Sequence, residues 1–182
     1  MQFTSLAIPE VLRIDLDPVA DERGFFARMF CVHELRSRGI NFAVAQCNNT
    51  LTRTAGTIRG FHFQRPPKAE CKIVRCLRGA ILDVAVDLRA GSKTYGESCS
   101  IELNDQNRSM ICIPHGFGHG FQTLLPDTEL MYFHSEFYSK VDEGGLHPLD
   151  ASVAICWPLP VRELSDRDRH LPCLSELEAI QL

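Results

Sequence analysis

Apolar and polar residues alternate along most of this chain. The alternation is clear in Val11–Leu16, and it recurs around residues 58–64, 72–77, 81–88, 97–103, 108–113 and 129–138. A period of two residues is typical of strands with one buried face. Turn-forming residues separate these segments, among them Arg78-Gly79, Ala90–Ser92, Asn104–Asn107 and Pro126-Asp127. Short strands at this spacing predict an all-β antiparallel sandwich or barrel.

Helical signals are few. Val32–Arg38 is followed by Gly39, which is a common stop residue, and this segment predicts a short helix. Leu174–Leu182 predicts a second one. No internal repeat, linker or low-complexity segment divides the chain. We therefore expect a single domain over residues 1–182, with an N-terminal strand arm and a C-terminal segment.

Composition narrows the class of protein. The 182 residues are 45% hydrophobic and 23% charged, as in ordinary globular proteins. The formal net charge is -4 and no run of Lys or Arg occurs, which argues against nucleic-acid binding. No stretch approaches the roughly 18 apolar residues of a membrane span, and the N-terminal residues do not resemble a secretory signal. We expect no membrane partner and a cytoplasmic location.

Eight cysteines are present, but none forms a C-x-x-C pair. Several lie inside apolar runs, including Cys76, Cys99 and Cys112. In a cytosolic protein of this length, such cysteines are expected to be reduced core residues rather than disulfide partners.

The alternation also groups polar side chains that could carry chemistry. It places His62 and Gln64 on one face of their strand. It places Tyr132, His134 and Tyr138 together on one face of another. If the aliphatic faces pack between the sheets, these polar faces line either solvent or a barrel mouth, where small-molecule sites are common.

Two segments resemble the signatures of the cupin jelly roll. Ile113–Gly120 contains P-x-G-x-x-H, the second signature, and the first would begin near Gly60. There the chain has Gln64 where metal-binding cupins have a second histidine. A neutral amide is a poor metal ligand, so a metal-free cupin is favoured. A metal-dependent cupin dioxygenase or isomerase, with ligands His62, Glu70 and His119, remains the alternative.

A wider set of motifs occurs in order along nearly the whole chain. They are Asp21–Phe26, Gln46–Thr50, Arg59–Gln64, Lys72–Arg75, Asp83–Arg89, Ile113–Phe121 and Trp157-Pro158. From about residue 3 to about residue 175 the chain resembles the dTDP-4-dehydrorhamnose 3,5-epimerase family. This resemblance implies a cupin jelly-roll β-barrel with short peripheral helices. It also implies a nucleotide-diphospho-4-keto-6-deoxysugar as substrate, epimerised at C3, C5 or both.

Such a reaction requires only a few functional groups. A ketone at C4 acidifies the hydrogens on C3 and C5, so removing one gives an enolate. Epimerisation then needs a base on one face, a group that stabilises the oxyanion, and an acid on the other face. We expect no cofactor, because the reaction is not a net oxidation and the chain has no Gly-rich dinucleotide motif. We also expect no metal.

The resemblance assigns the catalytic roles to four residues. His62 would be the base, Lys72 would stabilise the oxyanion, and Tyr132 would be the acid on the opposite face. A histidine base needs a carboxylate to orient it. The resemblance implies Asp168 for that part, and Asp83 on its own strand is a rival that the residues leave open.

Further positions are implied to contact the substrate. They are Arg23, Arg59 and Arg167 at the diphosphate, Tyr138 stacked on the nucleobase, His119 near the sugar, and Phe26, Arg28, Gln46, Asn48 and Glu143 around the nucleotide. Strict alternation puts Arg59 and His62 on opposite faces, so a bulge or strand end must intervene if both serve one site. Arg28 stands where the family usually has glutamate, which leaves the nucleoside open. A barrel with apolar strand edges is expected to pair with itself, and strand 11–16 is the candidate for exchange between subunits. The resemblance implies a homodimer, in which Arg23 serves the partner's site.

Overall fold

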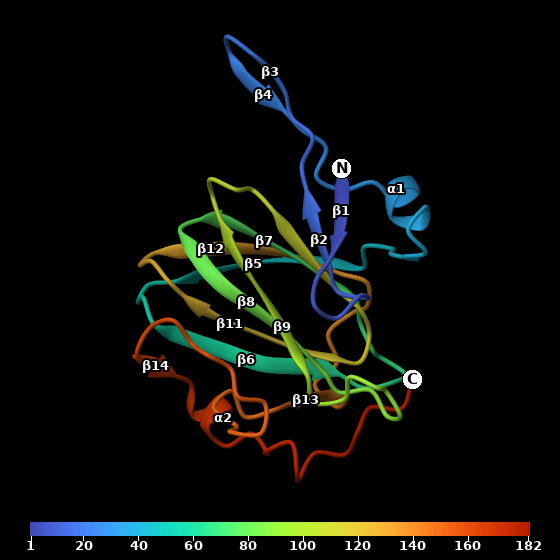
Figure 1. Cartoon of the computed structure of the whole chain (residues 1–182), viewed down its shortest axis with the longest axis vertical. Coiled ribbons are helices and arrows are strands. Elements are labelled where there is room, and N and C mark those ends of the chain that lie inside the picture. Colours follow the sequence, from blue (N-terminus) through green and yellow to red (C-terminus); the bar gives the residue numbers. More distant parts are fainter.

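The computed structural model describes residues 1–182 and is built almost entirely from strands (Figure 1). The strands are β1 (Gln2–Ser5), β2 (Leu12–Asp15), β3 (Val19–Asp21), β4 (Gly24–Phe26), β5 (Gln46–Thr52), β6 (Thr57–Gln64), β7 (Lys72–Arg78), β8 (Ala80–Asp87), β9 (Ser98–Asn104), β10 (Met110–Ile113), β11 (Phe117–Thr123), β12 (Thr128–His134), β13 (Glu143–Gly145) and β14 (Glu163–Leu164). Two short helices complete the fold, α1 (Val32–Arg36) and α2 (Asp166–Arg169).

Two antiparallel sheets face each other. One has the strand order β1-β2-β10-β7-β12-β5 and the other the order β13-β6-β11-β8-β9, with β14 added beside β6. Apart from the hairpins β1–β2 and β8–β9, neighbours in each sheet come from distant parts of the sequence, as in a jelly roll. The predicted all-β jelly-roll barrel is therefore confirmed.

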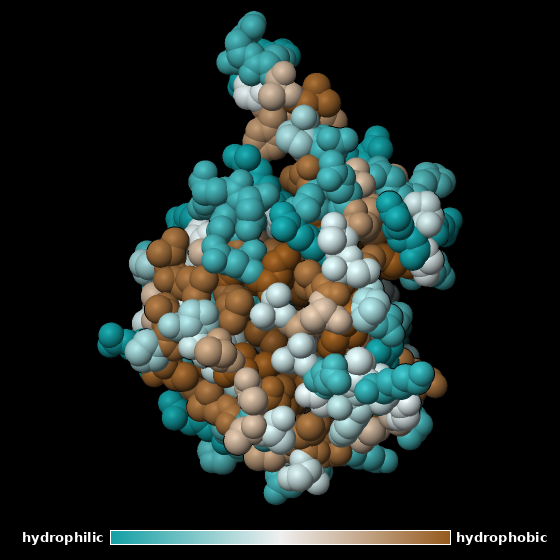
Figure 2. Space-filling view, in the orientation of Figure 1, coloured by the Kyte–Doolittle hydropathy of each residue, from teal (hydrophilic) through white to brown (hydrophobic).

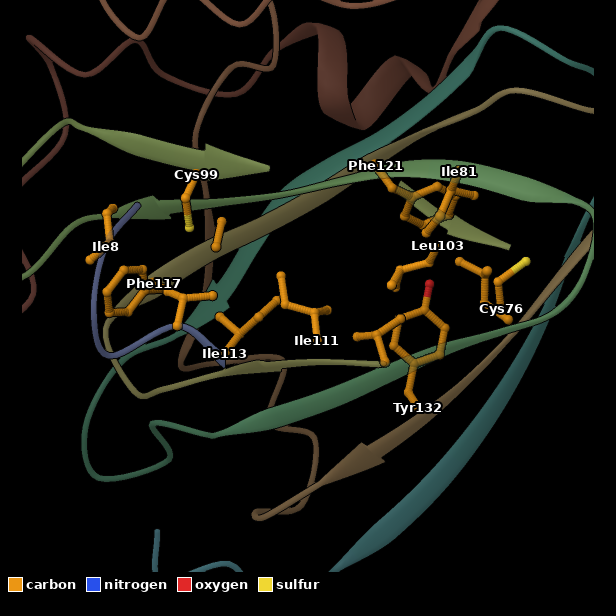
Figure 3. Close-up of a cluster of buried hydrophobic side chains, with 14 residues drawn as sticks. Ile8, Cys76, Ile81, Cys99, Leu103, Ile111, Ile113, Phe117, Phe121 and Tyr132 are labelled. Atoms are coloured by element: carbon orange, nitrogen blue, oxygen red, sulfur yellow. The ribbon is translucent and has the colours of Figure 1, made fainter. Parts of the chain in front are cut away.

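The main core lies between the sheets (Figure 3). Ile111 and Tyr132 point inward from the first sheet, and Ile81, Leu103 and Phe121 meet them from the second. All five are at most 8% exposed. Their inward positions follow from the alternation, since every second residue of each strand faces the opposite sheet.

All of the predicted strands form. Most of their ends differ by one or two residues from the predicted positions. The largest difference is in the last one, which ends at His134, so Tyr138 lies beyond it in a loop. The helix predicted from residue 32 forms as α1 and ends at Arg36.

The helix predicted over Leu174–Leu182 is wrong. This segment forms turns and one isolated bridge between Arg89 and Ile180. Ile180 is fully buried and its N–H donates to the carbonyl of Leu88 at 2.7 Å. The segment bonds to the end of β8 instead of to itself, and the burial of one apolar side chain outweighs weak local helix propensity.

A β-bulge interrupts the pairing of β6 with β11. His119 lies opposite His62, but the next pair is Phe121 with Arg59. Between these two pairs β6 advances by three residues and β11 by two, so β6 has one extra residue. Gly60 makes this possible, because its φ is +125° and a Cβ there would come within 2.5 Å of the backbone of Gly120. The bulge is the interruption that a shared site for Arg59 and His62 requires.

The β3–β4 hairpin extends away from the two sheets (Figure 1). Val19 and Phe26 in it are 74% and 76% exposed. In Figure 2 the tip of the hairpin is hydrophilic, whereas its base carries hydrophobic residues. An isolated two-stranded ribbon with this much apolar exposure is expected to pack against something else.

All eight cysteines are free thiols, and Cys71, Cys76, Cys99 and Cys112 are buried. Burial raises the pKa of Cys76 to about 12 and that of Cys99 to about 11. These thiols therefore act as core residues, as the sequence predicts. None of the helices is long and apolar enough to cross a membrane.

Candidate active site

A cavity of about 660 Å³ opens between the two sheets. It is lined by side chains from β5, β6, β7, β11, β12, β13 and β14, together with the loop before β13 and the segment around α2. Eleven of the predicted site residues line it: Gln46, Asn48, Arg59, His62, Lys72, His119, Tyr132, Tyr138, Glu143, Arg167 and Asp168. Residues that are separated by more than 100 positions in sequence thus meet in one space.

His62 and Asp168 form a close pair. The Nε2 atom of His62 lies 2.7 Å from Oδ1 of Asp168. The other carboxylate oxygen accepts the backbone N–H of Gly60 at the bulge, at 3.3 Å. The hydroxyl of Ser165 accepts the backbone N–H of Asp168 and caps α2. The bulge on β6 and the cap of α2 together bring this carboxylate to the histidine.

The charge of Asp168 fixes the tautomer of His62. Burial by itself raises the pKa of Asp168, but hydrogen bonds from His62, Gly60 and Ser165 outweigh it and leave that pKa below its usual value. An ionised carboxylate can only accept, so Nε2 of neutral His62 carries the proton. Its Nδ1 atom is then an unprotonated acceptor, and the side chain is 31% exposed toward the cavity.

Asp83 pairs with a different histidine. Its two oxygens lie 3.1 and 3.0 Å from Nε2 of His119, and Asp83 is completely buried. Burial raises the pKa of Asp83, against the opposing charge and hydrogen bond of His119. The rival carboxylate is therefore not the one in contact with His62.

Lys72 lies at the start of β7 and is 8% exposed. Its Nζ atom is 3.0 Å from Oε1 of Glu70 and donates to the carbonyl oxygen of His62 at 3.3 Å. An ammonium group has three protons, so one donor direction is left for a ligand in the cavity.

Tyr132 lies on the facing sheet from His62. Its ring stacks on His134, with centroids 5.9 Å apart, and meets His119 edge-on at 6.1 Å. Burial raises the pKa of Tyr132 well above its ordinary value. The phenol is therefore fully protonated at neutral pH and can serve only as a donor to a strong base.

The outer part of the cavity is held by a different set of contacts. Glu143 accepts a hydrogen bond from the hydroxyl of Tyr138 at 3.0 Å and pairs with Arg167 at 2.8 Å. Gln46 accepts the backbone N–H of Tyr138 at 3.0 Å. Arg59 donates to the hydroxyl of Thr52 at 3.1 Å. The cavity lining thus includes two guanidinium groups and an exposed aromatic ring.

Three predicted contacts lie outside this cavity. Arg23 pairs with Asp21 within the hairpin, and Phe26 is exposed beside it. Arg28 donates to Glu34 of α1 at 3.0 Å. Arg23 and Phe26 belong to the hairpin, which extends away from the two sheets (Figure 1), and Arg28 lies between the hairpin and α1.

The ligand set of the metal-dependent alternative is not assembled. Each candidate has another partner: Asp168 for His62, Asp83 for His119, and Lys72 for Glu70. No group of three or more His, Cys, Asp or Glu side chains is arranged to hold a metal ion.

The sequence reasoning missed several cavity residues: Thr50, Thr57, Ile58, Phe121, Glu163, Leu164 and Ser165. It also gave no part in substrate handling to Glu70 or His134, which line the cavity beside Lys72 and Tyr132. The available signal was spacing, because each of the two lies two residues from a predicted catalytic side chain, and His134 on the same strand face.

Comparisons with known proteins agree with this geometry. The family model described as dTDP-4-dehydrorhamnose 3,5-epimerase matches residues 5–176. The epimerase of that name from Sinorhizobium fredii is 42% identical, with the match covering 97% of this chain and 91% of the relative. The one from Streptomyces griseus is 40% identical, over 87% and 80% of the two chains.

Solved structures give the same picture. A 4-keto-6-deoxy sugar epimerase from the novobiocin gene cluster of Streptomyces spheroides superposes with a TM-score of 0.91 at 37% identity, covering 97% of this chain and 88% of the other. An epimerase from Legionella pneumophila in complex with dTDP-4-keto-L-rhamnose gives a TM-score of 0.91 at 32% identity, covering 97% and 94%. Both the sequence and the backbone are thus similar over nearly their whole length.

Proposed function

This chain belongs to the dTDP-4-dehydrorhamnose 3,5-epimerase family, and on that basis we propose that it epimerises a nucleotide-diphospho-4-keto-6-deoxysugar at C3, C5 or both. The observation that carries the proposal is the pair of His62 and Asp168 on one side of the cavity, with Lys72 and Tyr132 on the facing sheet. Base and acid on opposite walls are what inversion at carbon requires.

The first step is removal of a proton from carbon beside the C4 ketone. Nδ1 of His62 takes the proton, and the C–H electron pair moves into the enolate. His62 then becomes an imidazolium, which the ionised Asp168 stabilises at 2.7 Å. Burial of that carboxylate makes its charge more effective than it would be in water.

The negative charge that develops on the C4 oxygen is met by Lys72. Its third proton is free to bond this oxygen, and its side chain is 10% exposed, so water competes little. A preorganised cation of this kind interacts more strongly with the enolate than with the neutral ketone. It therefore stabilises the transition state more than the bound substrate, which lowers the barrier.

Tyr132 completes the inversion by giving its phenolic proton to the same carbon from the other face. The raised pKa of Tyr132 keeps the phenol protonated until an enolate, a strongly basic carbon, is present. His62 loses its proton to solvent and Tyr132 regains one, so that the protein ends unchanged.

The outer cavity suits the nucleotide. Arg59 and Arg167 provide guanidinium groups that match the geometry of diphosphate oxygens. Tyr138 is 58% exposed and offers a face for stacking a nucleobase. Gln46, Asn48 and Glu143 supply polar contacts around it. The relatives act on dTDP-sugars according to their names, and this chain is proposed to take the same class.

We further propose that the chain works as a homodimer in the cytoplasm. Strand 11–16, the predicted candidate for exchange, forms β2 within its own sheet, between β1 and β10. The hairpin that follows it, with its exposed Val19 and Phe26 and with Arg23 outside its own cavity, instead supports a partner chain that receives the hairpin. Arg23, Phe26 and Arg28 would then contact the substrate of the partner. The free, partly buried cysteines fit a reducing compartment.

The test is incubation of the protein with dTDP-, CDP- and GDP-linked 4-keto-6-deoxysugars in deuterated water. One or two deuterons per sugar are expected from the preferred nucleotide, and their number reports how many carbons are attacked. His62→Ala should abolish the incorporation, whereas His33→Ala, a change on the exposed face of α1, should not. Absence of deuterium with all three substrates would overturn the function, and incorporation by His62→Ala would overturn the base.

A further inference from the structure

A further buried carboxylate, that of Glu70, lies beside the proposed oxyanion site. The side chain of Glu70 is 8% exposed, and it bridges two groups that line the cavity. Oε1 lies 3.0 Å from Nζ of Lys72, and Oε2 lies 2.7 Å from Nδ1 of His134. Burying a carboxylate is costly unless both oxygens are bonded, and here each has one strong partner.

The atoms in contact favour one arrangement of donors and acceptors. Burial raises the pKa of Glu70, but the hydrogen bond from His134 and the charge of Lys72 leave it below its usual value, so the carboxyl is ionised. Nδ1 of His134 must therefore donate. Nε2 of His134 lies 3.3 Å from the amide nitrogen of Asn48, which is a donor, so Nε2 must accept. In this arrangement Nδ1 of His134 is the donor to Glu70 and Nε2 is the acceptor from Asn48.

The same contacts aim Lys72. Two of its three protons are directed to fixed acceptors, one at Glu70 and one at the carbonyl of His62. Because the ammonium group is tetrahedral, these two bonds set the direction of the third. Without the carboxylate, the flexible lysine side chain would have several rotamers within the cavity, and it would lose preorganisation rather than charge.

We propose that Glu70 and His134 are positioning residues for the epimerase reaction: together they direct the ammonium of Lys72 toward the C4 oxygen of the bound keto-sugar and link that group to Asn48. The inference rests on the proposed function, since it gives Lys72 its oxyanion role. His134 holds Glu70 against Lys72, and its own ring is held in turn by stacking on Tyr132. The network therefore connects the oxyanion site and the proposed acid.

The proposal predicts a split between kcat and KM for deuterium incorporation. Glu70→Gln keeps the size of the side chain but presents an acceptor to Lys72 or to His134, not to both. We expect kcat to fall about tenfold, with KM changed less than about threefold, since ground-state binding does not depend on the direction of one proton. The matched control is Glu136→Gln, which removes the carboxylate of a more exposed pair with Lys68 at 3.2 Å.

His134 gives a second and independent measurement. Glutamine in its place has both an amide donor for Glu70 and a carbonyl acceptor for Asn48, so His134→Gln should keep most of the activity. His134→Leu has neither group, so its kcat should match that of Glu70→Gln. The double variant Glu70→Gln/His134→Leu should have a kcat no lower than that of either single variant. This comparison stands even if Glu70→Gln fails to fold, which circular dichroism would show.

The outcomes separate the two claims. Folded Glu70→Gln with the kcat of the wild type, or His134→Gln as slow as His134→Leu, would overturn the positioning role and leave the proposed function intact. A wild-type protein that incorporates no deuterium from any 4-keto-sugar nucleotide would overturn the proposed function and this inference with it. A coupled loss in kcat, restored by His134→Gln, would support the inference.

Discussion

Replacing Asp168 with asparagine tests the proposed base more sharply than removing the histidine. The carboxylate accepts two hydrogen bonds, from Nε2 of His62 at 2.7 Å and from the backbone N–H of Gly60 at 3.3 Å. An amide has one acceptor and one donor end. If its oxygen faces Gly60, its NH₂ group faces His62 and forces the imidazole proton onto Nδ1. If its oxygen faces His62, its NH₂ group is set against the N–H of Gly60.

Both arrangements carry a cost that can be worked out. The first removes the acceptor that should take the substrate proton, and the second leaves a buried donor unpaired. In both, the imidazolium loses its ionic partner. Loss of tautomer and partner in a histidine–carboxylate pair is worth about 10³- to 10⁴-fold in rate. An unsatisfied buried donor costs about 1–3 kcal/mol of stability. We expect Asp168→Asn to fold and to lose nearly all exchange.

The stability difference should depend on pH with a definite sign. The pKa of Asp168 is lower in the folded chain than its ordinary value. Its stabilisation is therefore complete above the unfolded value of about 4 and is lost as pH falls through the lower folded value. The free energy of unfolding of the wild type should thus approach that of Asp168→Asn on acidification below about pH 4.

The assay is the rate of deuterium incorporation into the keto-sugar, with urea unfolding at pH 7 and at lower pH for stability. Asp166→Asn is the matched control, because it makes the same chemical change in α2 at an exposed residue outside the cavity. Exchange by Asp168→Asn within tenfold of the wild type would refute the reasoning. So would a stability difference that widened as the pH fell below about 4.

Two further changes probe the other wall of the cavity and the partner chain. Tyr132→Phe should slow product formation by about 10²-fold or more, while deuterium still enters through His62; unaffected product formation would contradict its role as the acid. Arg23→Ala combined with Phe26→Ala should raise KM for the sugar nucleotide, and light scattering of the wild type should give twice the mass of one chain. A fully active monomer would rule out exchange of the hairpin.

The sequence predicts strands well where one face is buried and the other is not. The two long strands that it missed lack that contrast. β5 contains Gln46-Cys47-Asn48-Asn49-Thr50 and lies at the edge of its sheet, so most of its residues are polar. β11 is buried at every position, so its two faces look alike in sequence. In both cases pairing with neighbouring strands decides the structure.

The predicted site divides in a similar way. Side chains on alternating strands were grouped correctly by face, and His62, Lys72 and Tyr132 meet in the cavity. Arg59 joins them only because of the bulge at Gly60, which alternation alone does not reveal. The contact of Asp168 with His62 joins positions 106 residues apart, so local pattern could not choose it over Asp83. The hairpin residues need a partner chain that one sequence does not describe.

Three histidines in this cavity face a buried carboxylate, yet only one combination suits a carbon base. His119 is 7% exposed, and burial raises the pKa of its partner Asp83, which disfavours the anion that an imidazolium would need. Nε2 of His134 is occupied by its contact with the amide of Asn48, and Nδ1 by Glu70. Neither ring offers both a free nitrogen and an ionised partner.

His62 has both. Its carboxylate is ionised, its Nε2 is bonded, and its Nδ1 is open to a cavity in which the ring is 31% exposed. Burial and the other contacts of each ring thus decide which of the three pairs can supply a base. Adding a carboxylate beside another histidine would therefore not by itself create a base. One ring nitrogen must be accessible to the substrate, and this matters as much as an ionised carboxylate bonded to the other nitrogen.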